Sequence, residues 1–88
     1  MSESFSQDLE TLKNVDAATM LGNHLFVLFQ VAAGRLAEEP PRSDDARLLI
    51  DTAAAMLQAG EGRLGSEEQL YRTALSELQQ LFVRATVR

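Results

Sequence analysis

The chain has 88 residues, of which 45% are hydrophobic and 24% are charged, and it contains no cysteine. That length allows one domain, and the lack of thiols excludes disulfide staples and thiolate metal sites. The formal net charge of −5 disfavours direct nucleic-acid binding, whereas a basic protein partner is compatible with it. A small domain without staples needs very well packed helices or a second copy of itself.

Residues 1–15 are predicted to form a flexible acidic N-terminal tail. They carry Glu3, Asp8 and Glu10 against the single lysine, Lys13, which is the wrong charge balance for a secretory or mitochondrial leader. Apolar residues at positions 5, 9 and 12 also allow a short amphipathic turn that docks on the body. Because terminal segments usually fray, the flexible tail is the preferred interpretation.

The first long helix is predicted over residues 16–38. Asp16 is a good N-cap, and Pro40 and Pro41 end the helix because the residue before a proline avoids the α region. Apolar side chains surround most of this helix, so two neighbours from one chain cannot cover it. We therefore expect a homodimer interface on this helix. The predicted interface residues are Leu21, Gly22, Leu25, Phe26, Leu28, Phe29 and Ala33.

A second helix is predicted over residues 44–59, with Ser43 as its N-cap. Asp44 and Asp45 fall in its first turn, where the helix dipole favours negative charge. Gly60 is the expected residue after the helix, because glycine adopts a positive φ without a Cβ clash.

The third helix is predicted over residues 67–86, after a glycine-rich hinge. Ser66 and Gln69 have the spacing of a capping box, in which each side chain bonds a free backbone N–H. No stretch alternates between apolar and polar residues, so strands are not predicted. The expected fold is all-α: an antiparallel three-helix bundle or hairpin assembly that is completed by dimerisation.

Two patterns resemble ligand sites but are interpreted as structural. Gly60, Gly62 and Gly65 match the glycine spacing of a dinucleotide fingerprint, but a helix rather than a strand precedes them. Glu38, Glu39, Asp44 and Asp45 bracket the two prolines; without EF-hand spacing they are expected to form a solvated corner. No metal or cofactor is therefore predicted.

His24 and Asp51 are polar residues within predicted helices. His24 is the only histidine and has no metal-ligating residue at i±3 or i±4, so a packing or interface role is preferred. At a dimer interface it would make association sensitive to pH. Asp51 either faces water beside Arg47 or forms a partly buried ion pair with another helix or subunit.

Aromatic residues at helical spacing usually pack inside a protein or at an interface. We therefore interpret the four aromatic residues of the long helices as core and interface residues; they are Phe26, Phe29, Tyr71 and Phe82.

The longest apolar stretch, Leu25 to Ala33, has nine residues including Gln30, whereas a membrane span needs about 20. The expected localisation is cytoplasmic.

The packing and hinge positions of the last two helices form a recognisable pattern. They are Ala46-Arg47, Ile50-Asp51, Met56-Leu57, Glu67-Glu68, Leu75, Leu78 and Phe82. Over about residues 16–85 the chain resembles the bacterial domain-of-unknown-function family 1844. The family hinge usually contains Gly-Asn-Leu-Thr where this chain has Gly62-Arg63-Leu64-Gly65, so a role of that Asn does not transfer. The resemblance implies a small all-helical bacterial protein without an assigned activity, whose relatives often lie near translation genes.

Three functions are compatible with these features. The leading hypothesis is a non-catalytic, homo-oligomeric protein-interaction module, most simply a homodimer. The alternative is an accessory factor that binds a basic protein, such as a component of the translation apparatus. The third is a carrier of a small apolar ligand, held between Phe26, Phe29 and Phe82. An enzyme is not expected, because one histidine and no cysteine leave few groups that titrate near neutral pH.

Overall fold

The computed structural model describes residues 3–87, and it describes side chains from residue 8 onward. Its α-helices are α1 (Glu3–Leu12), α2 (Ala17–Leu36), α3 (Ser43–Ala59) and α4 (Glu68–Thr86), with a short 3₁₀ turn, η1 (Gly65–Glu67), before α4. None of the residues from 3 to 87 lies in a β-strand. The prediction of an all-α fold is confirmed, and each predicted long helix is present within two residues of its predicted ends.

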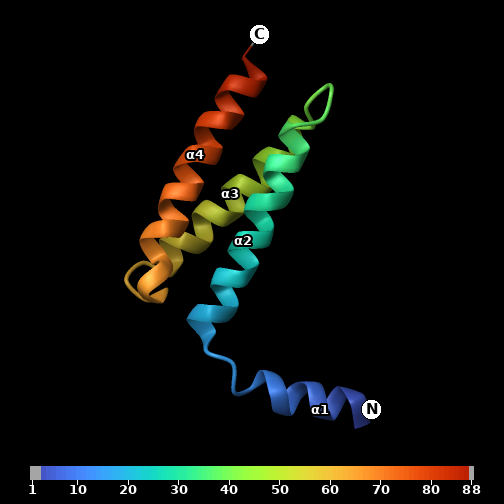
Figure 1. Cartoon of the computed structure of the whole chain (residues 1–88), viewed down its shortest axis with the longest axis vertical. Helices are drawn as coiled ribbons and strands as arrows, with labels where there is room; N and C mark the ends of the chain where they lie inside the picture. Colours follow the sequence, from blue (N-terminus) through green and yellow to red (C-terminus); the bar gives the residue numbers. More distant parts are fainter. Residues whose placement is uncertain (1–2, 88) are drawn as a thin grey trace.

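Helices α2, α3 and α4 pack against one another and form the body of the molecule. Short connections make each of them run opposite to the one before it, so α2 and α4 point the same way (Figure 1). Those two helices lie side by side in front of α3. The face of the body opposite α3 is therefore a seam between α2 and α4.

The core is supplied mostly by α2 and α3. Leu25 of α2 and Leu57 of α3 are fully buried, whereas Leu78 is the only buried residue of α4 among the described residues. The other apolar residues on the inner stripe of α4 remain partly exposed. They are Tyr71, Ala74, Leu75, Leu81, Phe82 and Ala85. Helix α4 thus leaves apolar surface uncovered within the single chain.

The start of α2 follows the sequence prediction. The carboxylate of Asp16 accepts a hydrogen bond from the backbone N–H of Thr19 at 3.0 Å, which is the geometry of an N-cap. The prediction for Ser43 is displaced by one residue: Ser43 is the first residue of α3, and Arg42 occupies the N-cap position without a side-chain cap bond. Asp44 and Asp45 do lie in the first turn of α3.

The hinge between α3 and α4 differs from the prediction. Gly60 ends α3 with φ of −92°, so its expected positive φ is wrong; the positive values occur at Gly62 and Gly65. A Cβ at Gly60 would lie 2.9 Å from the Leu64 side chain, so close packing explains this glycine instead.

The capping box predicted at Ser66 and Gln69 is also wrong. Ser66 lies within η1, and α4 begins at Glu68 with no side-chain bond at its N-cap. The free backbone N–H groups of the loop are instead bonded by the first residue of α4, Glu68. The Glu68 carboxylate accepts hydrogen bonds from the N–H groups of Gly62 and Leu64, each at 3.0 Å.

Helix α1 stands apart from the body. Ten residues of the predicted tail are helical, which is more than the short turn that the apolar spacing suggested. Within the described chain, α1 contacts no other helix and not η1. Figure 1 shows it projecting from the start of α2 and pointing away from the body.

Candidate functional site

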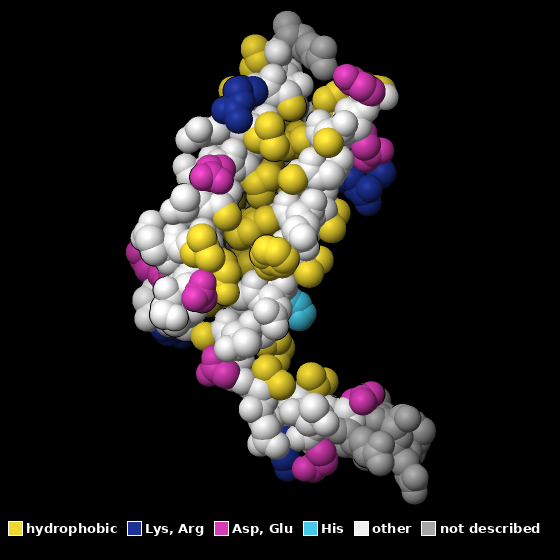
Figure 2. Space-filling model, viewed as in Figure 1, with side chains coloured by type: hydrophobic (Ala, Val, Ile, Leu, Met, Phe, Trp, Pro, Cys, Tyr) yellow, Lys and Arg dark blue, Asp and Glu magenta, His cyan; other side chains and the backbone are white. Residues whose placement is uncertain are grey.

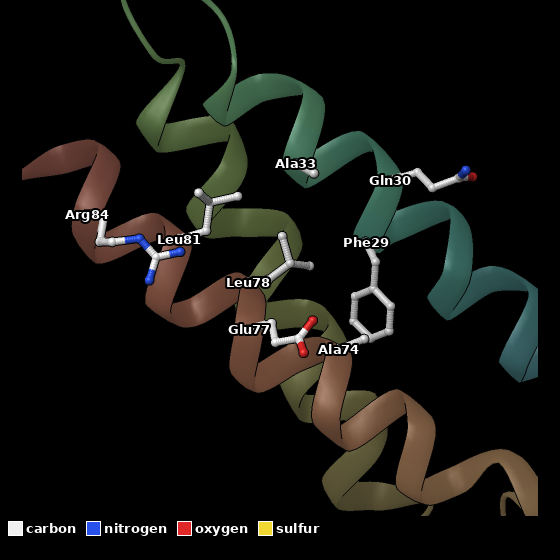
Figure 3. Close-up of a pocket in the computed structure, with 8 residues that line it drawn as sticks. All are labelled: Phe29, Gln30, Ala33, Ala74, Glu77, Leu78, Leu81 and Arg84. Atoms are coloured by element: carbon white, nitrogen blue, oxygen red, sulfur yellow. The ribbon is translucent and has the colours of Figure 1, made fainter.

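An apolar groove runs along the seam between α2 and α4. It is a shallow hollow of about 400 Å³ that is broadly open to solvent. Figure 3 shows Phe29 and Ala33 on α2 facing Ala74, Leu78 and Leu81 on α4, with Gln30 and Arg84 at the outer rim. We call the surface formed by Phe26, Phe29, Ala33, Ala74, Leu78 and Leu81 the α2/α4 groove face. Figure 2 shows hydrophobic side chains gathered along this seam.

Phe26 makes the groove face larger than the hollow itself. It lies one turn before Phe29 and two turns before Ala33 on the same side of α2, and 58% of its surface is exposed. An exposed phenylalanine beside an open apolar hollow is typical of a surface that another molecule covers. Other large side chains of α2 are exposed too, namely Leu21, Val27 and Val31. The excess of apolar surface predicted for this helix is therefore present in the single chain.

The structure divides the predicted interface residues into three groups. Gly22, Leu25 and Phe29 are buried inside the chain, so their assignment to an open interface is wrong. Phe29 is a partial exception, because the edge of its ring lines the groove. Phe26 and Ala33 lie on the groove face. The remaining two, Leu21 and Leu28, lie on the opposite flank of α2.

A side chain of α4 approaches Gly22 closely. The hydroxyl end of Tyr71 on α4 occupies the space that a Cβ at Gly22 would fill. The two helices therefore come together at this end of the seam. The groove lies further along the two helices, between Phe29 and Ala33 on α2 and Ala74, Leu78 and Leu81 on α4.

The predicted aromatic pocket is not formed. Phe29 lines the groove between α2 and α4, whereas Phe82 lines a separate hollow between α3 and α4 with Ile50 and Gln79. Both rings also pack against the core. Phe26, Phe29 and Phe82 therefore do not enclose one ligand between them.

The polar residues that the sequence highlighted lie outside the groove face. His24 is exposed and lies about 200° around α2 from Phe26, so it points away from the groove. Asp51 is paired with Arg47 at 3.7 Å, with both side chains about two-thirds exposed, which confirms the simpler of its two interpretations. Across the part of the chain that is described, no three His, Asp or Glu side chains gather as a metal site.

The acidic corner is balanced by arginines. Arg42 pairs with Asp45 at 2.6 Å and with Glu38 at 3.7 Å, and Arg35 lies 3.6 Å from Asp45. This network ties the end of α2 to the start of α3. It is a structural connection rather than a free acidic surface.

Among the described residues, Glu68 is the one titratable group whose pKa is clearly shifted. Hydrogen bonds from the backbone N–H groups of Gly62 and Leu64, together with the nearby Arg72 guanidinium, hold the pKa of the Glu68 carboxyl below its ordinary value. Arg72 bonds Glu68 at 3.0 Å and also donates to the Leu57 carbonyl at 3.1 Å. The cluster fixes the hinge and does not face the groove.

Comparisons with protein families, curated proteins and solved structures find no match to this chain. Membership of the family that the sequence resembles therefore stays a prediction. Helix α2 has the length and mean hydropathy, 1.3, of a membrane-spanning helix. Core helices of soluble proteins and leader segments meet the same criteria, so this property assigns no location.

Proposed function

We propose that this protein is a non-catalytic, homodimeric interaction module, and that a second copy covers the α2/α4 groove face. The observation that supports this most directly is Phe26, 58% exposed beside an open apolar hollow of about 400 Å³. Small domains without disulfides commonly complete their apolar core by oligomerisation.

The energetics favour covering this face. Removing apolar surface from water contributes about 25 cal/mol per Å², so a few hundred Å² on each copy supplies several kcal/mol. In a two-fold dimer the same surface is used twice, so each favourable contact counts double. The exposed ion pairs of the described residues lie at the end of α1, on α3 and at the acidic corner, outside the groove face.

Phe26→Asp tests the proposal. Burial of one phenylalanine contributes about 1.5–3 kcal/mol, and a two-fold dimer contains two, so we expect the dimer dissociation constant to rise at least about 100-fold. Sedimentation equilibrium measures this constant. Leu48→Asp is the matched control, because Leu48 is 68% exposed on the outer side of α3, away from the groove. The control is expected to dimerise like the unchanged chain.

Two results would contradict the proposal. One is an unchanged chain that stays monomeric at all accessible concentrations. The other is a Phe26→Asp variant whose dimer constant equals that of Leu48→Asp. A monomer that instead binds a basic protein or a small apolar molecule would favour the alternative functions predicted from the sequence.

A further inference from the structure

We infer that the part of the second copy that fills the α2/α4 groove is its helix α1, so that the two chains exchange N-terminal arms. This inference rests on the proposed homodimer and adds which segment makes the contact. The arm is α1 (Glu3–Leu12) with the connection through Asp16, and the receiving surface is the groove face.

Helix α1 lacks the support that a short helix needs. It has ten residues, and isolated helices below about 12–15 residues are marginal in water. It contacts no other element among the residues described, yet Leu9 and Leu12 are each 53% exposed and lie one turn apart. A surface that covers these two leucines would supply the missing stability.

The groove has the dimensions for such a helix. Ten residues of α-helix span about 15 Å, which is the distance covered by α4 from Ala74 to Arg84 along the groove. Ala33 and Ala74 have small side chains, and Figure 3 shows them on the two sides of the hollow. Small residues on facing walls allow a third helix to approach closely, while Leu78 and Leu81 supply an apolar floor.

Polar residues are placed to bond the solvent side of the arm. Gln30, Glu77 and Arg84 lie among the groove-lining residues, and α1 carries Asp8 and Glu10 beside its leucines. Arg84 is complementary to the Asp8 carboxylate of the arm, whereas Glu10 is already paired with Lys13 at 2.8 Å. Glu77 disfavours registers that bring Asp8 next to it.

The area is sufficient for a specific contact. A ten-residue helix about 15 Å long and about 10 Å across has a half-surface of roughly 240 Å². Arm and groove each lose that area, and a two-fold dimer has two arms, so roughly 1,000 Å² is covered in total. This reaches the value of about 1,000 Å² that specific protein interfaces need.

The connection between α1 and α2 favours the groove of a second copy over that of the same chain. The turn is closed by backbone hydrogen bonds from Lys13 to Leu9 at 3.0 Å and from Val15 to Leu12 at 3.1 Å. Asp16 then caps α2. In the structure α1 points away from its own groove (Figure 1), and the body of its own chain does not cover its leucines. A second copy can present its groove to α1 without any change in this connection.

Cross-linking tests which groove the arm occupies, and the cysteine-free sequence allows single thiols to be introduced cleanly. One chain carries Leu9→Cys, and a second, mass-tagged chain carries Gln30→Cys at the groove rim. A short bis-maleimide is expected to join the two chains into a mixed dimer. Leu9→Cys mixed with Leu48→Cys is the control and is expected to give no such product. A single chain with both Leu9→Cys and Gln30→Cys that cross-links within itself, as a monomer, would overturn the inference.

A second variant separates this inference from the proposed function. Leu9→Asp with Leu12→Asp removes the apolar stripe of α1 and leaves the core untouched, so circular dichroism should show a folded body. We expect its dimer dissociation constant to rise at least tenfold. If this variant dimerises like the unchanged chain, the arm is not the occupant, but the homodimer stands. If the unchanged chain is a monomer, both proposals are wrong.

Discussion

Gly22 and Gly34 show how two glycines of one helix can have different physical reasons. Both lie within α2, where glycine costs about 1 kcal/mol relative to alanine. At Gly22 the Tyr71 side chain fills the place of a Cβ, whereas nothing lies within 4 Å of a Cβ built at Gly34. The first glycine is required by packing, and the second is not.

Replacing each of these glycines by alanine should therefore change stability in opposite directions. Gly34→Ala is expected to raise the free energy of unfolding by about 0.5–1 kcal/mol, because the unfolded chain loses freedom. Gly22→Ala should lower it by about 1 kcal/mol or more, because Tyr71 must move. Urea denaturation at a fixed protein concentration measures both.

The Tyr71→Ala background is the control for this pair. Without the ring, Gly22→Ala has space and is expected to become stabilising, as Gly34→Ala is. If Gly22→Ala already stabilises the unchanged chain as much as Gly34→Ala does, the close approach of α2 and α4 at this point is contradicted.

Single-residue predictions from the sequence succeeded where the interaction is local. The Asp16 cap reaches only three residues ahead, and the Arg47–Asp51 pair spans one helical turn, so spacing alone defines both. The prediction of a positive φ at Gly60 was wrong, because the turn places the Leu64 side chain against Gly60 and this contact is what requires a glycine. A glycine pattern cannot distinguish a positive φ from a close contact before the path of the loop is known.

At the scale of elements, the α3–α4 hinge is organised by Glu68. Its carboxylate pairs with Arg72, one turn later on α4, at 3.0 Å. The same carboxylate also closes the loop by accepting hydrogen bonds from the N–H groups of Gly62 and Leu64, six and four residues earlier. That second role depends on a 3₁₀ turn before α4, which the Ser66–Gln69 pattern did not predict. The sequence therefore located the hinge but assigned its cap to the wrong side chain.

The hinge predicts an acid sensitivity that can be assigned to one residue. Because folding lowers the Glu68 pKa, the unfolded chain binds more protons as the pH falls. The stabilisation is complete above the ordinary glutamate value of about 4.3 and is lost as the pH falls through the lower folded value. We expect the Glu68→Gln variant to melt at a lower temperature than the unchanged chain near neutral pH.

The pH dependence supplies the check. Between pH of about 5 and about 3 the melting temperature of Glu68→Gln should fall less steeply than that of the unchanged chain, because the shifted group is gone. Glu61→Gln, at an exposed position in the same loop, is the control and should keep the slope of the unchanged chain. Equal slopes for Glu68→Gln and the unchanged chain would show that the hinge cap does not exist in solution.

Helix α1 is the element that the spacing of apolar residues in the sequence predicted least accurately. Three apolar positions one turn apart identified an amphipathic segment but not its length, since ten residues contain too few turns to define a helix by periodicity alone. Among the described residues α1 packs against no other element, so the core pattern contains no signal for it. The groove that we propose as its receiving surface is visible only in the structure.

At the scale of the whole molecule, the sequence predicted the excess of apolar surface on α2. It did not predict which apolar residues of α2 are buried in the chain and which stay exposed. Apolar residues occur on most sides of that helix, and the sequence alone does not distinguish the ones that become buried. Packing assigns Leu25 to the interior and leaves Phe26, its neighbour, 58% exposed. Which side faces inward depends on where α3 and α4 cross α2, and that is set by the hinge and by the contact between Gly22 and Tyr71.

The same arrangement explains why the open face lies between α2 and α4. Helix α3 contacts both of its neighbours from behind, and three helices of this length enclose a core on one side of that seam only. A fourth helix would close the seam, as in a four-helix bundle. The chain has such a helix in α1, but holds it away from its own body.

The molar mass in solution tests the central claim most directly. Light scattering coupled to size-exclusion chromatography, on the unchanged chain over a range of micromolar concentrations, is expected to give about twice the 9.7 kDa of one chain, falling toward 9.7 kDa only on dilution. A mass of 9.7 kDa that does not change up to hundreds of micromolar would contradict the account, because the α2/α4 groove face would then remain open to water in the free protein.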